Sequence, residues 1–340
     1  MESHSEPLQA FLGGVGLALS VHSLLVLNGS VLGVSGFIHR SVRGDLVAAL
    51  SVFGMILGGA VIRLLGQAEP AGVLPSGLPQ KIFSGLLVGM GTKLANGCTS
   101  GHMIAGVSRF SKRSFVATAM FFLTGIPTAG LVHGRSLVPV GSTDWSLGRN
   151  GVHIAVVLGA LVTLWATYLM FPAHIVKGRV CAQTNASTQA PPSPRSCELH
   201  WHLRLFANLL TSFAFSVSLH VGNMVDPRKV LSFLVLPTSV AFDPTIAYLA
   251  AGALPLSIVL YRYARANEEP LFTGQWTVPR SDKIDKRLLA GSAMFGVGWG
   301  LSGICPGPIL VNLGLASFSG GETVGDAAWL VSMVFGGFLV

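Results

Sequence analysis

Two cysteines occupy positions where chemistry is to be expected, because each lies in a short polar break that ends an apolar stretch. Cys98 lies in residues 96–102 (NGCTSGH) and Cys305 lies in residues 302–308 (SGICPGP). Lipid cannot satisfy the backbone N–H and C=O groups that a broken helix exposes, so such a break lines a polar cavity or packs inside protein. A cysteine in a membrane helix is usually a small packing residue. Placement in two similar breaks nevertheless favours a functional role for both thiols.

The first break also predicts the charge of a ligand. A half-helix that begins near Thr99 and Ser100 would direct free N–H groups and its positive dipole end into the break, which favours an anion. Lys93 adds a positive charge just before the break, and no Asp or Glu accompanies it in that segment. The spacing of the His and Cys residues predicts neither a metal site nor a cofactor site. We therefore expect an anionic substrate.

The amino-acid composition is that of a membrane protein. Of 340 residues, 51% are hydrophobic, 11% are charged and 42 are glycine, whereas soluble domains carry about 25% charged residues and about 7% glycine. An ordinary soluble enzyme, a disulfide scaffold and a disordered protein are excluded, because so few charges cannot cover a globule of this size. The net charge of +8 lies in short clusters between apolar stretches, which is typical of loop charges that orient spans rather than of nucleic-acid binding.

Apolar runs long enough to cross about 30 Å of hydrocarbon predict the membrane spans. They lie at 8–33, 46–65, 115–132, 151–172, 203–222, 244–263 and 325–340. Two further runs, 82–96 and 288–302, stop at the cysteine-containing breaks, and the short segments 103–107 and 309–316 follow them; 230–237 is a candidate re-entrant piece. The predicted fold class is all-α, a polytopic integral protein of the cell membrane with about nine to eleven spans.

A polar segment divides the chain into two halves that resemble each other. Residues 173–200 have the Ser, Thr, Gln and Pro content of a flexible linker, between a membrane half at 8–172 and another at 201–340. When the sequence is aligned with itself at an offset of 206 residues, Gly97 matches Gly303 and Gly101 matches Gly307. With five spans before the linker, the second half would be inverted relative to the first. Basic loops favour an outside N-terminus and a cytoplasmic linker.

The motifs around both breaks resemble a known family. Residues 96–102, with 106–109 (GVSR) and 113–118 (RSFVAT), closely resemble the first signature of the YeeE/YedE family, the sulphur-transport domain proteins. Residues 298–308 (GWGLSGICPGP) resemble its second signature. Residues 222–233 with 242–244 are similar to the segment that opens the second half in relatives whose halves are separate proteins. The resemblance covers most of 10–340 apart from the linker and implies a fusion of two halves.

This resemblance implies membrane proteins that take up thiosulfate along a central path, where cysteines hold the ion by S–H···S contacts. Cys98 and Cys305 match two such cysteines, while a third, expected near the N-terminal span, is absent and Ser30 lies in that region. A serine hydroxyl is a harder donor than a thiol, so this departure bears on which sulfur anion is carried. The residues expected to bind substrate are Ser30, Lys93, Asn96, Gly97, Cys98, Thr99, Ser100, His102, Gly303, Cys305 and Pro306.

The preferred interpretation is a transporter, not an enzyme, that takes up thiosulfate or a related sulfur-containing anion through a cysteine-lined path in the lipid bilayer. Our hypothesis is that burial keeps both thiols protonated, so that they act as weak donors. The alternative is a membrane sulfurtransferase or relay that passes a cysteine persulfide to a soluble sulfur-carrier protein. A third is a non-transporting membrane scaffold. Transport is favoured because no acid–base pair accompanies either cysteine, although His102 lies close to Cys98 in sequence and keeps the relay open.

Overall fold

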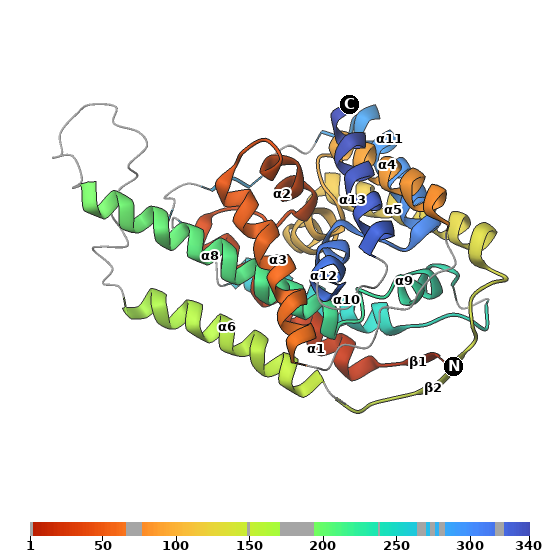
Figure 1. Ribbon diagram of the computed structural model, residues 1–340, viewed down its shortest axis with the longest axis horizontal. Coiled ribbons are helices and arrows are strands. Elements are labelled where there is room, and N and C mark those ends of the chain that lie inside the picture. The colour runs from red at the N-terminus through yellow and green to blue at the C-terminus, as the bar shows by residue number, and fades with distance from the viewer. Residues whose placement is uncertain are drawn as a thin grey trace.

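The computed structural model is helical almost throughout (Figure 1), which confirms the all-α class. It describes residues 3–65, 77–147, 150–170, 194–236, 239–263, 270–272, 276–278, 283–316 and 323–340. The predicted linker lies largely outside these residues. Its last part, 194–200, is helical, and the division into two halves stays a prediction.

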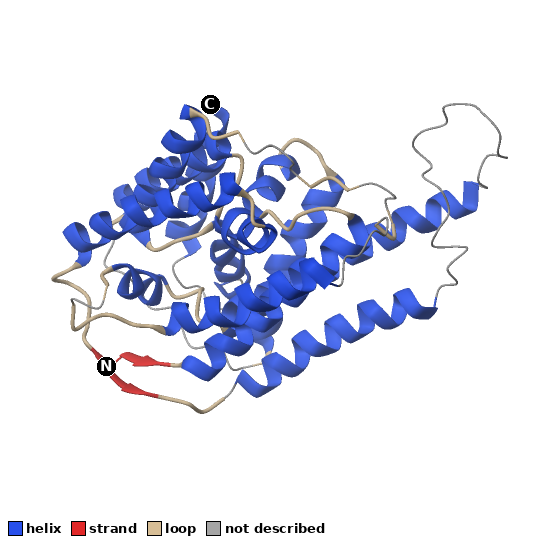
Figure 2. Ribbon diagram, turned by 180° about the vertical axis from the view of Figure 1, so that it is seen from behind, coloured by secondary structure: helices blue, strands red, loops and turns tan. Residues whose placement is uncertain are grey.

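Helices from both parts of the chain form the body of the molecule. The N-terminal half supplies α1 (Pro7–Asn28), α2 (Val34–Ser41), α3 (Leu46–Leu64), α4 (Leu78–Ala95), α5 (Lys112–His133) and α6 (Asn150–Met170). The C-terminal half supplies α8 (Pro194–Val221), α9 (Pro227–Leu234), α10 (Thr245–Tyr263), α11 (Lys286–Ser302), α12 (Pro306–Ala316) and α13 (Thr323–Phe338). Between α4 and α5 lie a π-helix, η1 (Ser100–Gly106), and a short 3-10 turn, η2 (Val107–Arg109). Strands β1 (Ser3–Ser5) and β2 (Val140–Thr143) pair in parallel at the molecular edge near the N-terminus (Figure 2).

Five described stretches are long and apolar enough to cross a membrane, as a multi-pass protein requires. They are α1, α3, α5, α10 and the stretch Lys286–Ala316 that contains α11 and α12. Shorter apolar helices cover Gly151–Ala166 and Val324–Phe338. The total of about nine to eleven spans stays a prediction.

The first span ends earlier than its apolar pattern predicts. We expected a span over 8–33, whereas α1 ends at Asn28 because Gly29 adopts a left-handed conformation with φ of 63° and its N–H bonds to the carbonyl of Leu25. Glycine ends helices in this way because it has no Cβ to clash. The chain then enters the short α2, which lies beside the first break.

Helices from the two halves interleave rather than forming separate bodies. α1 packs against α10 and α8, α3 against α8 and α12, and α4 against α11 and α13. α6 and α8 run side by side in both views (Figures 1 and 2). Helices from both halves therefore surround the two breaks.

Glycines allow α4 and α11 to pack backbone against backbone. A Cβ at Gly91 would lie 2.6 Å from the nitrogen of Phe295, and a Cβ at Gly298 would lie 2.8 Å from the carbonyl oxygen of Ser84. An early residue of α4 thus faces a late residue of α11, so the two helices are antiparallel. This packing agrees with an inverted repeat, which stays a prediction.

Candidate substrate path

Backbone conformation ends both broken helices at their predicted places. α4 stops because Asn96 adopts a left-handed conformation with φ of 57°, and the N–H of Gly97 bonds back to the Thr92 carbonyl at 3.0 Å. α11 stops at Gly303, whose φ is 67° and whose missing Cβ would lie 2.4 Å from the Pro227 carbonyl oxygen. Pro306 then begins α12, where a missing N–H costs nothing.

The two breaks meet through their polar side chains. The Thr99 hydroxyl donates to the Cys305 sulfur at 4.0 Å, and the Cys98 sulfur lies 3.3 Å from the Ser100 hydroxyl. The Ser100 hydroxyl also accepts from the N–H of Val34 at 3.3 Å, which ties the first break to the start of α2. Both cysteines are free thiols and each is only 1% exposed. The fold therefore places two sequence-distant thiols in one buried neighbourhood.

A small apolar cavity lies beside these thiols, and we call it the thiol cavity. It measures about 70 Å³, enough for several waters or a small anion, since one water needs about 10–15 Å³. Cys98, Thr99, Ser100 and Cys305 supply its thiols and hydroxyls, and the remaining lining is mostly apolar, from side chains such as Leu17, Phe122, Phe215, Leu249 and Trp299. The rings of Phe122 and Trp299 stand 5.7 Å apart in an edge-to-face arrangement, which fixes one wall.

A larger and more polar cavity lies on the other side of η1, and we call it the basic chamber. It measures about 330 Å³. Of the predicted site residues it is lined by Ser30, Lys93, Asn96, Gly97 and His102, and it adds the side chains of Arg40, Arg109 and Arg113. None of its described lining residues is Asp or Glu. The chamber is therefore suited to anions.

The π-helix η1 forms the partition between the two compartments. Ser100, Met103 and Ile104 line the thiol cavity, whereas Gly101 and His102 line the basic chamber. We expected a half-helix that begins near Thr99 and Ser100, and the structure has the 7-residue η1 there, with the N–H of His102 bonded to the Cys98 carbonyl at 2.8 Å. The attraction of an anion by the N–H groups of this turn stays a prediction.

His102 points away from the neighbouring thiol. Its Nδ1 lies 3.1 Å from the Ser114 hydroxyl and its Nε2 lies 3.3 Å from the Ala95 carbonyl oxygen. Gly97 makes room for the ring, since a Cβ there would lie 2.8 Å from Nε2. None of these contacts involves a sulfur, so the ring holds the end of α4 against α5.

Most of the predicted site residues thus divide between two compartments. Gly303 and Pro306 shape the second break and line neither cavity among the described residues. Sequence reasoning missed the roles of Arg40, Arg109 and Arg113, which were assigned to span orientation. For Arg109 and Arg113 the signal was their position shortly after the first break, whereas Arg40 lies far from that break in sequence and gave no such signal.

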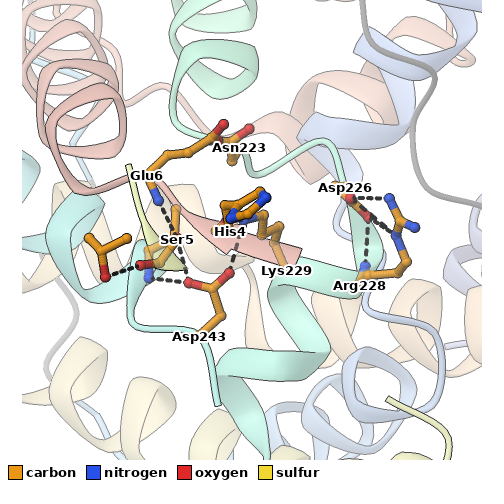
Figure 3. A network of polar contacts seen from close by, with 10 residues as sticks. His4, Ser5, Glu6, Asn223, Asp226, Arg228, Lys229 and Asp243 are labelled. Carbon is orange, nitrogen blue, oxygen red and sulfur yellow. Dashed lines mark hydrogen bonds and ion pairs between the residues drawn. The ribbon is translucent and has the colours of Figure 1, made fainter. Parts of the chain in front are cut away.

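A polar network lies beyond the thiol cavity, next to the N-terminus (Figure 3). Lys229 forms an ion pair with the buried Asp243 at 3.0 Å and donates to the carbonyl of His4, and Asn223 donates to Glu6. Desolvation raises the pKa of Glu6 above its usual value, against the opposing charge of Lys229 and the hydrogen bond from Asn223.

The network involves residues that are next in sequence to the lining of the thiol cavity. Met224 and Ile246 line the thiol cavity, and they follow Asn223 and Thr245, whose side chains bond to the Glu6 side chain and backbone N–H respectively. The residues before α1 therefore join segments of the second half.

Comparisons with known proteins agree with this architecture. Residues 7–127 match the family described as sulphur transport, and residues 203–339 match a family of unknown function, DUF6691. A probable transporter of Xylella fastidiosa (strain 9a5c) is 43% identical over 127 residues, which are 37% of this chain and 94% of that protein. Another probable transporter of the same strain is 35% identical over 115 residues, which are 34% of this chain and 78% of that protein. No solved structure matches the chain.

Proposed function

Because this chain belongs to the sulphur transport family of membrane proteins, we propose that it carries a sulfur-containing anion, preferably thiosulfate, past the two cysteine-containing breaks. The observation that carries the proposal is the meeting of Thr99 with Cys305 at 4.0 Å in a cavity that Cys98 also lines. Broken helices at matching positions of two repeats are the usual place for a transporter's substrate.

The two compartments would contribute differently to binding. The basic chamber provides positive charge, and the thiol cavity provides polarisable thiol donors. The basic chamber attracts an anion by its cationic side chains. The thiol cavity offers a mostly apolar wall with two thiols and two hydroxyls, which suits the terminal sulfur of thiosulfate better than a fully hydrated oxygen. Thiols are weak donors, and weak sites in series allow an ion to leave as well as enter.

Passage between the compartments requires movement of the partition. Ser100 and Gly101 are consecutive residues that face different compartments, so an ion moves between them only if η1 shifts. Single π-helical turns often occur at functional sites. We therefore assign the gating movement to η1.

A sulfur relay is the competing function, and the contacts of His102 favour transport over it. A relay needs a base to activate the attacking thiol. The described contacts of the His102 ring are to Ser114, the Ala95 carbonyl and the Phe121 ring, so it is not placed to deprotonate Cys98.

Uptake of labelled thiosulfate into liposomes by the pure protein tests the proposal. Cys98→Ala and Cys305→Ala each remove a donor to a charged ligand, a bond worth about 1.5 kcal/mol or more, so uptake should fall about tenfold. The matched control is the double variant Cys181→Ala/Cys197→Ala, which removes the chain's other two cysteines and should transport normally. Uptake that survives loss of both cavity thiols would refute the thiol path.

The same assay separates the remaining alternatives. No uptake by the wild type, together with a persulfide trapped on Cys98 or Cys305, would establish the relay. If the thiols act in their protonated form, uptake should not increase between about pH 6 and about pH 9, because a thiolate repels an anion.

A further inference from the structure

The basic chamber brings together positive charges that the sequence keeps far apart. Arg40, Lys93, Arg109 and Arg113 all line it. Arg40 has an ion pair with Asp45 at 3.7 Å, whereas Arg113 donates to the backbone carbonyls of Lys283 and Ala95, which are neutral. The side-chain ammonium of Lys93 has no hydrogen bond or ion pair with any residue in the described part of the chain. The chamber therefore has positive charge available for a ligand.

Neutral hydrogen-bonding groups complement these charges. Hydroxyls of Ser30 and Ser111 and the amide of Asn96 line the same chamber. His39 also lines it and is only 8% exposed, yet its Nε2 has no hydrogen-bond partner among the described residues. That atom lies beside Gly337 of α13, where a Cβ would be 2.7 Å from it. The two hydroxyls and the amide are therefore the neutral groups that complement the charges.

The size of the chamber indicates what kind of anion it holds. At about 330 Å³ it is several times larger than the thiol cavity of about 70 Å³, so an anion can enter the chamber with part of its water shell. Arginine and hydroxyl donors recognise oxygen atoms and negative charge. Neither thiol is among the lining residues. The described lining residues therefore include no thiol that would select a terminal sulfur over a terminal oxygen.

We propose that the basic chamber is a separate binding site for tetrahedral, doubly charged oxyanions, which it selects by charge and not by sulfur. The proposal rests on the proposed function in that the chamber then precedes or follows the thiol cavity on the path of thiosulfate. Sulfate, which shares the charge and three of the oxygens of thiosulfate, binds the chamber but fails at the thiol cavity. Sulfate is thus a competitor that is not transported.

Equilibrium binding of labelled sulfate to the full-length protein in nanodiscs, at constant ionic strength, tests the proposal. Lys93→Gln removes one charge from the chamber and should weaken sulfate binding by about tenfold, while Lys93→Arg should restore most of it. The matched control is Arg43→Gln, since Arg43 packs over the Phe338 ring at 5.6 Å and is not a lining residue. Its sulfate affinity should stay within about twofold of the wild type.

The double variant Cys98→Ala/Cys305→Ala separates the chamber from the transport path. It should bind sulfate as the wild type does and transport no thiosulfate. Absence of sulfate binding, equal weakening by Lys93→Gln and Arg43→Gln, or loss of binding in the double variant would each overturn the chamber proposal. Sulfate binding that depends on Lys93 in a protein that transports no thiosulfate would support the chamber and refute the proposed function instead.

Discussion

The Thr99 hydroxyl lies 4.0 Å from the Cys305 sulfur, and the two residues are 206 positions apart. That separation equals the shift that aligns the two glycine frames in the sequence, so residues at matching positions of the two halves touch each other. A two-fold axis that relates two repeats brings matching residues together where it passes between them. The contact is what an inverted repeat predicts at its centre.

Thr99→Val keeps the shape of the side chain and removes the hydroxyl that contacts Cys305. If the hydroxyl orders the thiol for the passing anion, thiosulfate uptake should fall by about fivefold, the equivalent of about 1 kcal/mol for one hydrogen bond. Liposome uptake rates measure the change. Thr99→Ser retains the hydroxyl and should transport at close to the wild-type rate, and equal loss in both variants would show that only packing matters here.

Close packing of α4 on α13 makes Gly89 intolerant of a methyl group. A Cβ at Gly89 would lie 2.0 Å from the carbonyl oxygen of Met333. Overpacking of this kind costs about 1–3 kcal/mol, so Gly89→Ala should lower the unfolding temperature in detergent.

Gly130 in α5 provides the matched control for the same substitution. A Cβ added at Gly130 would have no other atom within 4 Å. Alanine is favoured over glycine in helices by up to about 1 kcal/mol. Gly130→Ala should therefore leave the unfolding temperature unchanged or slightly raised. If the two variants behave alike, the close approach of α4 to α13 is refuted.

The positions of the broken helices were predictable because the residues that end them are chemically distinctive. Asn96 and Gly303 tolerate positive φ, and α4 and α11 end directly before them. The end of α1 was missed, since residues 30–33 continue the apolar pattern and hydropathy does not register the backbone conformation of Gly29.

The division of the site into two compartments was not predictable from the sequence. It depends on which face of η1 each side chain occupies, and a π-helix departs from the α-helical period on which sequence patterns rest. The basic residues were ascribed to span orientation because that rule explains them without a cavity. Only the fold brings Arg40 from α2 to the same chamber as Arg113 from α5.

Lys81 in α4 and Asp326 in α13 form a buried ion pair whose loss should be costly. Their charged atoms are 3.6 Å apart, and the side chains are 7% and 16% exposed. Asp326→Asn removes the carboxylate of this ion pair, and breaking a buried pair by removal of one partner typically costs about 3–5 kcal/mol. The unfolding temperature measured in detergent should therefore fall substantially below that of the wild type.

The exposed pair of Arg228 with Asp226 is the control for that loss. Its ionic atoms are 3.0 Å apart but the Arg228 side chain is 52% exposed, so Arg228→Gln should cost about 0–1 kcal/mol. Because Lys81 remains buried in Asp326→Asn, the double variant Lys81→Met/Asp326→Leu should recover part of the stability. No recovery would show that packing rather than charge explains the effect.

Titration of Glu6, just before α1, should make the unfolding temperature of the protein depend on pH. Burial raises the pKa of its carboxyl above the usual value of 4.5, despite the opposing effects of Lys229 and Asn223. A raised folded-state pKa means that the carboxyl stabilises the fold most at low pH and loses that contribution as pH rises through the raised value. Glu6→Gln stays neutral at every pH and can keep a bond with Asn223. The unfolding temperature of the variant relative to the wild type should therefore increase between about pH 4 and about pH 8.

Asp144, in the loop after β2, provides a control of opposite sign for Glu6. Hydrogen bonds from the backbone N–H and the hydroxyl of Ser146 hold the pKa of its carboxyl below the usual value. A lowered folded-state pKa contributes stability above the unfolded-state value and loses it in acid. The unfolding temperature of Asp144→Asn relative to the wild type should thus fall as pH rises through the usual value of 3.8, and should change little between about pH 5 and about pH 8. A Glu6→Gln profile that is equally flat over that range would contradict the burial of Glu6.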